Sequence, residues 1–541
     1  MSAVARHAVI VVPVAFLGLF FAYPLVQILR ESLSAGDGFS LSPFGDVLGD
    51  DFYLERIWFT LWQASVSTVL TLALGLPSAY FFARYDFPGK TAIRALTTVP
   101  FVMPTLVVAF GFLALVGPNG ILPLNLTDTI WIILLAHVFF NYTVVVRTVS
   151  TLWANVDPRT EEAARMLGAG PIEVFRRITL PQIAPAIAAS GLLVFLFTFT
   201  SFGVILILGG PEFATIEVTI YNLTARLFRL PLAAVLSLVQ LVFTFAFSVL
   251  YARIQERSAV PLNFQPRAAG ARRAQTGRER LFLIGNFAVV LVIVLAPLLA
   301  LVERSLDSAS GYTLQHYSGL ETNDQGRVFF VSLSEATKNS VGFAAATMLI
   351  AVPLGTMIAF GLARGRGRWR TLADGAFMLP LGASAITLAF GILIAFDERP
   401  LNLRASWTIV VIAHVLIAYP FVVRSVLAVV RGIDERLREA ATMLGASPIR
   451  VFRYIDLPIT SRAMLVGATF AFAVSMGEFG AALLLTRPEW STMPVAIFRY
   501  LGQPGAERLG AALAMSVVLM GVSAVGFLLI ERFRYQDVGE F

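Results

Sequence analysis

Long apolar segments alternate with short polar segments along almost the whole chain. Each apolar segment is close to the roughly 20 residues that a helix needs to cross a bilayer. The pattern predicts an all-α integral membrane protein with twelve transmembrane helices, six on each side of a polar tract at residues 255–280. The apolar segments cover residues 9–29, 59–83, 93–116, 130–152, 183–208, 232–251, 281–302, 341–363, 373–396, 407–430, 464–485 and 511–530. This divides the chain into one six-helix half at residues 1–254, a linker at 255–280 and a second half at 281–541.

Composition supports a membrane protein. The 541 residues are 57% hydrophobic and 14% charged, and the mean hydropathy is +0.77, which is too apolar for a soluble protein. A net charge of +7 raises the question of nucleic acid, but the arginines cluster in alternate loops between apolar segments, so we expect no nucleic-acid partner. The absence of cysteine excludes disulfides, thiolate metal sites and cysteine nucleophiles.

The first apolar segment has two interpretations. It follows Arg6 and His7, as the apolar part of a signal peptide would. No small-residue cleavage site is convincing, however, and Tyr23-Pro24 interrupts its end. We interpret it as a retained first transmembrane helix.

Basic residues predict the orientation of the chain. One set of alternating loops is rich in arginine, and short basic loops remain on the cytoplasmic side. This set predicts a multi-pass inner (plasma) membrane protein with both termini in the cytoplasm. The tract at 255–280 contains proline, glycine and several arginines and is predicted to be a flexible cytoplasmic linker. The basic segments lie near residues 84–94, 159–177, 253–280, 364–370, 431–453 and 532–534.

A polar segment on this basic side occurs twice. Residues 162–181 read EAARMLGAGPIEVFRRITLP, and residues 439–458 read EAATMLGASPIRVFRYIDLP, with fifteen of twenty positions identical. The spacing of 277 residues also relates His137 to His414 outside this segment. One structural unit has therefore been used twice. Because each half has an even number of predicted helices, we expect two parallel pseudo-repeats related by an axis near the membrane normal.

Local signals predict two short helices in each copy. In the first copy Asp157 is a good N-cap and Pro158 suits the first helical position. Gly168 can end this helix in the left-handed conformation, and Pro171 opens a second short helix. Pro181 and its counterpart are expected to begin the next membrane helix. A single such loop could be an amphipathic connector on the membrane surface, whereas two similar copies suggest a partner that is itself two-fold.

Both copies resemble the EAA loop of permease subunits of binding-protein-dependent ABC importers. The resemblance implies a type I importer permease, with each loop forming a coupling helix that docks on an ATPase subunit. It also implies an extracytoplasmic substrate-binding protein, and two ATPase subunits for each chain that contains both halves. The coupling residues that the resemblance implies are Glu162, Ala163, Ala164, Leu167, Gly168, Ala169 and Pro171, with Glu439, Ala440, Ala441, Leu444, Gly445, Ala446 and Pro448.

The fused two-half layout is similar to that of permeases for thiamine and for ferric iron. Residues 200–203, 208–211, 215–217 and 475–480 look closer to the thiamine branch. The resemblance thus implies a small cargo, thiamine or ferric iron.

The chain carries no site for its own catalysis. Pro88-Gly89-Lys90-Thr91 contains the end of a Walker A motif, but Arg84 stands where its leading glycine should be. We therefore expect no enzymatic activity and no cofactor in this chain, with ATP used by the partner subunit. Four histidines spread over the chain do not form a metal-binding cluster.

Glu478 is the ionisable residue that stands out within an apolar segment. Carboxylates inside membranes are costly and tend to face a bundle interior or a wet cavity. Glu478, with its repeat counterpart Ser201, is a candidate for the translocation pathway and would favour a cationic substrate. The alternative is an internal hydrogen bond to a neighbouring helix. His137 and His414 are expected to form interhelical hydrogen bonds, with a pathway role as the alternative.

A second class of transporter fits the helix count. A secondary transporter with two six-helix halves, driven by an ion gradient, would need intramembrane charges for coupling, for which Glu478 is the candidate. It would leave the duplicated polar loop unexplained. A membrane-embedded enzyme lacks any catalytic cluster.

Overall fold

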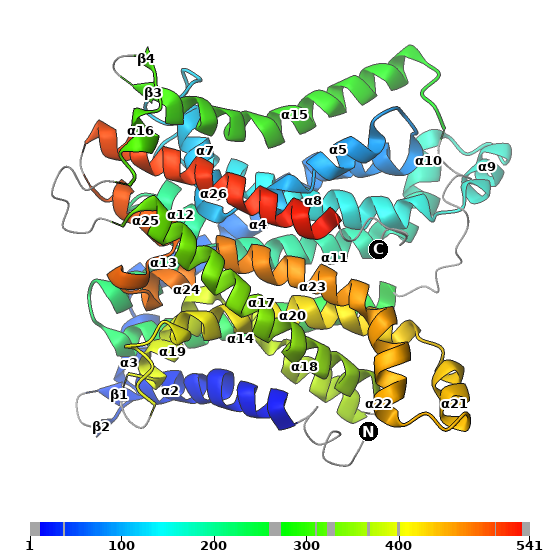
Figure 1. Cartoon of the computed structure of the whole chain (residues 1–541). Helices are drawn as coiled ribbons and strands as arrows, with labels where there is room; N and C mark the ends of the chain where they lie inside the picture. The colour runs from blue at the N-terminus through cyan, green and yellow to red at the C-terminus, as the bar shows by residue number, and fades with distance from the viewer. Residues whose placement is uncertain are drawn as a thin grey trace.

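The protein is a bundle of long helices that run between two ends (Figure 1). The computed structural model describes residues 11–35, 38–258, 272–308, 311–321, 331–364, 368–397, 401–503 and 505–532. Two small antiparallel ladders lie at one end, and the repeated loops lie at the other (Figure 1). These ladders pair β1 (Ser34–Ala35) with β2 (Gly38–Phe39) and β3 (Asp307–Ser308) with β4 (Gly311–Tyr312). The predicted all-α membrane fold is confirmed.

The helices follow the two predicted halves. Residues 11–17 are helical. The first half continues with η1 (Gly18–Ala22), α2 (Tyr23–Ser32), α3 (Ser42–Leu48), α4 (Asp51–Arg84), α5 (Lys90–Leu96), α6 (Val99–Val102), α7 (Thr105–Val116), α8 (Ile130–Ala154), α9 (Pro158–Met166), α10 (Pro171–Val174), η2 (Phe175–Thr179), α11 (Leu180–Phe199), α12 (Gly203–Leu208), α13 (Ile216–Ala225) and α14 (Leu230–Ser258). The second half contains α15 (Gly277–Leu306), α16 (Gln315–Ser318), α17 (Leu333–Arg364), α18 (Arg368–Gly382), α19 (Ala385–Ala395), α20 (Thr408–Gly432), α21 (Glu435–Met443), α22 (Pro448–Val451), η4 (Phe452–Asp456), α23 (Leu457–Gly477), α24 (Gly480–Leu485), η5 (Pro488–Trp490), α25 (Met493–Leu501) and α26 (Ala506–Arg532).

The third predicted helix of each half is broken. In the described part of the chain, ten helices are long and apolar enough to cross a membrane. The segment predicted as one helix at 93–116 is divided among α5, α6 and α7, and the one at 373–396 is bent by 98° between α18 and α19. Pro104 disfavours helical backbone at Met103, which is extended with ψ 135°. At the second break Ser384 is extended and caps α19. Hydropathy alone does not register such breaks.

The fifth predicted helix of each half is interrupted as well. The segments predicted at 183–208 and 464–485 are divided into α11 with α12 and α23 with α24. After each of these pairs the chain forms a further short helix, α13 or α25, where the sequence predicted a loop. Both short helices are largely buried. They were missed because ten and nine residues are too few for a spanning segment.

The first helix of each half packs against the other half. Equivalent three-helix cores form from α4, α8 and α11 and from α17, α20 and α23. In addition, α2 packs against α14 of its own half and α19 of the other, while α15 packs against α26 of its own half and α7 of the other. Nothing in the sequence pattern predicts this exchange of first helices. The division at residues 1–254 and 281–541 stays a prediction from the repeat.

Glycines make these two crossings close. A Cβ atom added at Gly111 on α7 would lie 2.8 Å from the carbonyl oxygen of Pro297 on α15. At the equivalent crossing, a Cβ at Gly391 on α19 would lie 3.2 Å from Cβ of Pro24 on α2. A side chain at either glycine would push the two halves apart.

The ends of the predicted linker belong to the flanking helices, and a flexible linker between them stays a prediction. Helix α14 continues to Ser258 and α15 begins at Gly277. Between them, Arg272 donates its N–H to the carbonyl of Arg84 and accepts from the N–H of Asp86, both at 3.0 Å. Helix α15 then begins with a capping box. Residues 259–271 lie outside the described part.

Candidate functional site

The first repeated loop, residues 157–181, folds as its local signals predict. Asp157 caps α9 by accepting from the N–H of Arg159 at 3.0 Å. Gly168 then ends this short helix with φ +89°, a conformation that costs other residues about 1–2 kcal/mol. Pro171 begins the next helix. We call this segment loop 1.

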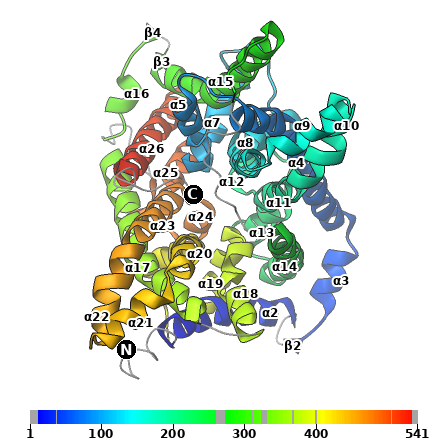
Figure 2. The same ribbon diagram turned by 90° about the vertical axis from the view of Figure 1, so that its right-hand side faces the viewer.

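The second copy, residues 434–458 or loop 2, repeats the same geometry. Asp434 accepts from the N–H of Arg436 at 3.0 Å, and Gly445 has φ +80°. Ser447 adds a cap of its own by accepting from the N–H of Arg450 at 3.4 Å. Seen end-on, α9 and α10 lie on one side of the bundle, whereas α21 and α22 lie on the opposite side (Figure 2).

Pro181 and Pro458 stand in the first turn of α11 and α23, so each membrane helix begins at its proline, as predicted. The helical backbone of the loop nevertheless continues into each of them. One continuous helix runs over Pro171–Phe199, and another over Pro448–Gly477. The turn before each proline is π-helical, in η2 and η4. A proline inside an α-helix clashes with the carbonyl four residues earlier, and the wider π turn avoids that clash.

The coupling residues inferred from the sequence form an exposed surface at each loop. In loop 1 Glu162, Ala163, Leu167, Gly168 and Pro171 are exposed, and Ala164 and Ala169 are half-buried. Loop 2 repeats this pattern at every position, with Glu439, Ala440, Leu444, Gly445 and Pro448 exposed and Ala441 and Ala446 half-buried.

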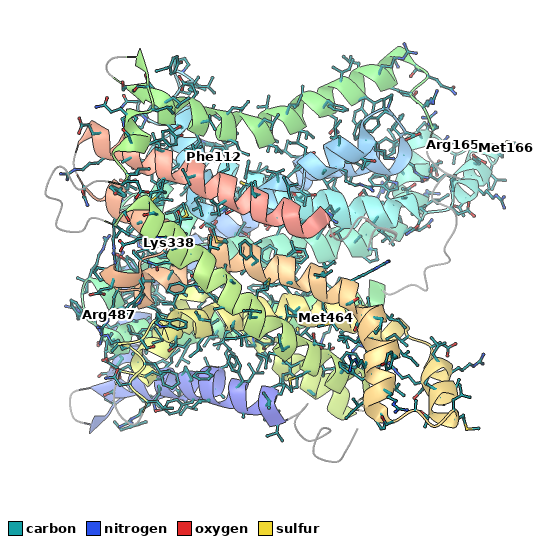
Figure 3. All side chains as sticks on the ribbon, viewed as in Figure 1. Phe112, Arg165, Met166, Lys338, Met464 and Arg487 are labelled. Atoms are coloured by element: carbon teal, nitrogen blue, oxygen red, sulfur yellow. The ribbon has the colours of Figure 1, made fainter. Side chains whose placement is uncertain are left out.

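Large apolar side chains stand at the tips of both loops. Leu167 and Leu444 are each 89% exposed, and Met166 and Met443 precede them at 87% and 89%. Figure 3 shows Met166 at the outer tip of the bundle beside Arg165. Helices α9 and α21 bury no residue of their own. Apolar clusters surrounded by polar residues mark contact sites for another molecule.

Replacing Gly168 is expected to loosen loop 1 locally. Nothing lies within 4 Å of a Cβ built there, so the cost of Gly168→Val is backbone strain of about 1–2 kcal/mol. Amide exchange of residues 163–169 should therefore accelerate roughly 5- to 30-fold. Gly168→Asn should have a smaller effect, because asparagine tolerates the left-handed region. Equal exchange rates in the wild type and both variants would contradict the expectation.

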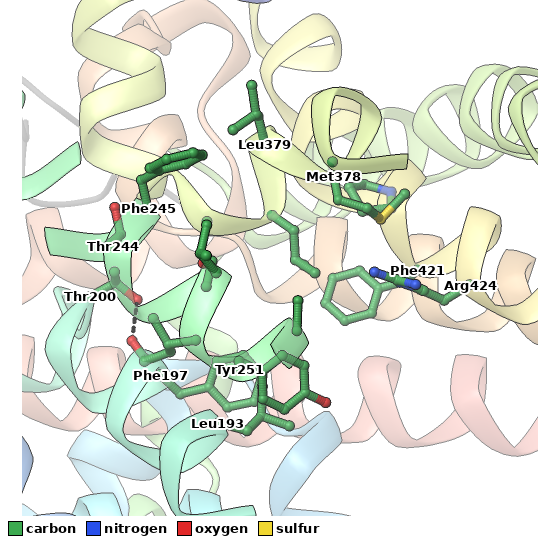
Figure 4. A pocket seen from close by; sticks show the side chains of 18 of the residues that line it. Leu193, Phe197, Thr200, Thr244, Phe245, Tyr251, Met378, Leu379, Phe421 and Arg424 are labelled. Carbon is green, nitrogen blue, oxygen red and sulfur yellow. Dashed lines mark hydrogen bonds between the residues drawn. The ribbon is translucent and has the colours of Figure 1, made fainter. Parts of the chain in front are cut away.

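A cavity of about 1800 Å³ lies between the two halves. Its lining comes mainly from α8, α11 and α14 of the first half and from α18, α20 and α23 of the second. Aromatic side chains form much of its wall, among them Phe197, Phe245, Tyr251 and Phe421 (Figure 4). Thr200 lines it near the interruption between α11 and α12.

The charged part of this lining lies toward the loops. Arg424 and Arg431 on α20 flank Asp374 on α18, with nitrogen–oxygen distances of 4.0 and 3.7 Å. Arg147, the repeat counterpart of Arg424, also lines the cavity. Arg431 stands close to the start of loop 2, so the basic end of the cavity and the loops share one end of the bundle.

Glu478 forms an internal cap. Its two carboxylate oxygens accept from the N–H groups of Ala481 and Ala482, each at 2.9 Å, at the start of α24. The side chain is buried, and Nε2 of His414 lies 3.4 Å away. Among the described residues, those lining the cavity do not include Glu478. This geometry favours an internal hydrogen-bonding role for Glu478. Its role in the translocation pathway stays a prediction.

Ser201 has the equivalent position in the first half. Its hydroxyl lies 2.9 Å from Nε2 of His137, whose Nδ1 lies 3.0 Å from the hydroxyl of Ser67 on α4. Ser201 is also outside the described cavity lining. The histidines therefore join helices, as expected. His137 contacts Ser201 in the first half, and at the equivalent place in the second half His414 lies beside Glu478.

The Glu478→Gln substitution distinguishes a capping role of Glu478 from a role in the translocation pathway. Glutamine has one acceptor oxygen, so one N–H of α24 loses its partner, at a cost of about 1–3 kcal/mol. We expect a lower thermal stability of the purified protein with unchanged selectivity among cargoes. The matched variant Ser201→Ala removes the partner of Nε2 of the buried His137, so it should also lower the stability and leave the selectivity unchanged. A change of selectivity at wild-type stability would instead establish the pathway role.

Four aromatic rings pack together at the boundary between the halves. Phe202 stacks on Phe479 across the boundary between the halves, with centroids 5.6 Å apart and planes at 27°. Tyr221 packs on Phe202 at 5.6 Å, and its counterpart Phe498 packs on Phe479 at 5.5 Å. Thr200 lines the cavity, whereas Phe202, two residues further on, is buried. The sequence revealed the repeat of these residues but not their contact.

Sequence reasoning also missed a buried carboxylate. Glu217 on α13 is fully buried and accepts a hydrogen bond from Gln240 on α14, and α13 packs against α19 of the other half. The sequence placed Glu217 in an outer loop, because α13 is too short to give a hydropathy signal. Only the fold brings it to the boundary between the halves.

Comparison with known proteins agrees with this geometry. Residues 71–260 and 351–534 both match the family described as the binding-protein-dependent transport system inner membrane component. The chain is 25% identical to the thiamine transport system permease protein of Escherichia coli, over 90% of each chain. It is 27% identical to that of Brucella abortus, over 92% of this chain and 91% of the relative. A probable ABC transporter permease of Sinorhizobium fredii is 26% identical over 88% of this chain and 87% of the relative.

Proposed function

Because the chain belongs to the family of inner membrane components of binding-protein-dependent transport systems, we propose that it carries thiamine into the cytoplasm as the permease of an ABC importer. The observation that carries the proposal is the pair of exposed, apolar-tipped loops on opposite sides of a cavity that both halves build. The names of the relatives support the choice of thiamine.

The geometry supports a division of work between the two ends of the bundle. Two copies of an ATPase subunit bind loops 1 and 2, one copy at each loop, so one permease chain binds two ATPase chains. A substrate-loaded binding protein docks at the opposite end, outside the aromatic rings of Phe202 and Phe479. Both termini and both loops then face the cytoplasm. ATP-driven closure of the subunits moves the loops, and the halves alternate between outward and inward access.

The cavity has chemistry that suits a flat cargo. Thiamine contains two heteroaromatic rings, one of them cationic. The faces of Phe197, Tyr251 and Phe421 offer stacking and cation–π contacts to such rings. Asp374 lines the cavity but is flanked by Arg424 and Arg431, so in this proposal the aromatic faces bind the cation. In this proposal the cargo passes between aromatic walls that hold it weakly enough for release.

The proposal is tested in proteoliposomes that contain the permease, its ATPase subunit and the binding protein. Radiolabelled thiamine should accumulate only when ATP and the binding protein are both present. Uptake of ferric iron in place of thiamine would overturn the choice of cargo. Uptake driven by an ion gradient without ATP would identify a secondary transporter and overturn the importer mechanism.

A further inference from the structure

In each loop a pair of side chains bridges the left-handed glycine. In loop 1 Glu161 on α9 accepts from the hydroxyl of Thr179 in η2 at 2.9 Å. In loop 2 Arg438 on α21 donates Nε–H to the carboxylate of Asp456 in η4 at 2.7 Å. These pairs occupy equivalent positions, 277 residues apart, yet their chemistry differs. The two partners are 18 residues apart in both loops, but Glu161 and Thr179 are replaced by Arg438 and Asp456.

Both pairs are shielded from water on the membrane-helix side. Thr179 is 4% exposed and Asp456 1% exposed. The side chains that reach them from the coupling helices, Glu161 and Arg438, are 15% and 25% exposed. Contacts of this kind are screened less by solvent than surface ion pairs.

Loop 1 has a third member. Arg84, at the end of α4, donates Nη2–H to the same oxygen of Glu161 at 2.5 Å. Loop 1 is therefore linked to two membrane helices, α4 and the one containing α11. In loop 2 the bridge links α21 to the helix containing α23.

We propose that these bridges, Glu161–Thr179 with Arg84 in loop 1 and Arg438–Asp456 in loop 2, transmit the movement of the ATPase subunits to the membrane helices. Each coupling helix joins the following helix through a glycine joint, which by itself can bend and absorb a push on the loop. The bridge spans that joint, so the coupling helix and the membrane helix move as one rigid body. The inference rests on the proposed coupling role of the loops.

The two contacts of Glu161 give a first test. Thr179→Ala leaves Glu161 bound to Arg84, so we expect the thiamine imported per ATP hydrolysed to fall less than two-fold. Glu161→Ala removes both contacts, and the same ratio should fall about ten-fold, while the ATPase subunits remain bound. An equal ratio in these two variants would overturn the proposal. The ratio is the informative readout, because a merely misfolded fraction lowers uptake and hydrolysis together.

A reversible bridge provides the second test within one folded protein. The natural chain has no cysteine, so Arg438→Cys with Asp456→Cys introduces the sole pair of thiols. A short bis-methanethiosulfonate linker between them should restore the ratio of import to hydrolysis about ten-fold, and reduction should abolish that gain. An unchanged ratio after linking would overturn the inference. If the wild type itself failed to bind ATPase subunits or to import thiamine, the proposed function would fail instead.

Discussion

Replacing Leu167 and Leu444 with arginine together is expected to abolish ATP-driven thiamine uptake without reducing the amount of folded permease in the membrane. Both side chains are 89% exposed in the isolated chain, so folding does not depend on them. Burying a leucine at an interface contributes about 1.5–3 kcal/mol, which is a factor of roughly 10 to 100 in affinity for each loop. A buried arginine without a partner adds a desolvation cost.

The measurement is the amount of ATPase subunit that co-purifies with the permease, followed by uptake in proteoliposomes. Each single variant should retain one ATPase subunit, and the double variant should retain neither. Leu314→Arg is the matched control, because Leu314 is 67% exposed and precedes α16 near the opposite end. Normal co-purification of the double variant would show that the loops are not the ATPase contact.

The Gly111→Leu substitution is expected to have the second large effect, on stability of the whole bundle. The added Cβ would lie 2.8 Å from the backbone oxygen of Pro297, and a backbone atom cannot rotate away. Helix α15 must shift, at a cost of roughly 1–3 kcal/mol or more. The apparent melting temperature in detergent should fall by several degrees.

Two other glycines calibrate this result. Gly285 lies on α15 itself with nothing within 4 Å of its Cβ position, so Gly285→Leu should leave the melting temperature nearly unchanged. Gly391→Leu should have an intermediate effect, since the nearest atom, 2.9 Å away, belongs to the flexible side chain of Ile28. If Gly111→Leu and Gly285→Leu melted at the same temperature, the close crossing of α7 and α15 would not hold the halves together.

The exchange of first helices has a mechanical consequence. Helix α2 packs on α19 and α15 packs on α7, so neither half moves without carrying the first helix of the other. In the mechanism that we propose, the moving bodies are therefore not the two sequence halves. Each body is one three-helix core with the loop attached to it, and the bridges of loops 1 and 2 connect the ATPase subunits to these cores at α11 and α23.

The sequence alone determined the class of protein and predicted which loops contact an ATPase subunit. Apolar segments long enough to cross a bilayer as helices predicted the membrane helices. The arginines in the loops predicted which side of the membrane each polar segment faces. The short helices of the loops could be predicted because helix caps and glycine joints are local features. Asp157 and Gly168 act on backbone atoms only a few residues away. Neither needs the rest of the fold to be recognised.

Tertiary structure decided what depends on distant residues. Hydropathy is an average over a window, so it did not show the breaks at Met103 and Ser384 or the buried short helix that carries Glu217. Glu478 drew attention as a lone intramembrane acid, yet the break after Gly477 turns it toward the backbone of α24. The bridges across the glycine joints and the stack of Phe202 on Phe479 are contacts between residues far apart in the chain. A sequence repeat predicts equivalent positions, but only packing determines which of them touch.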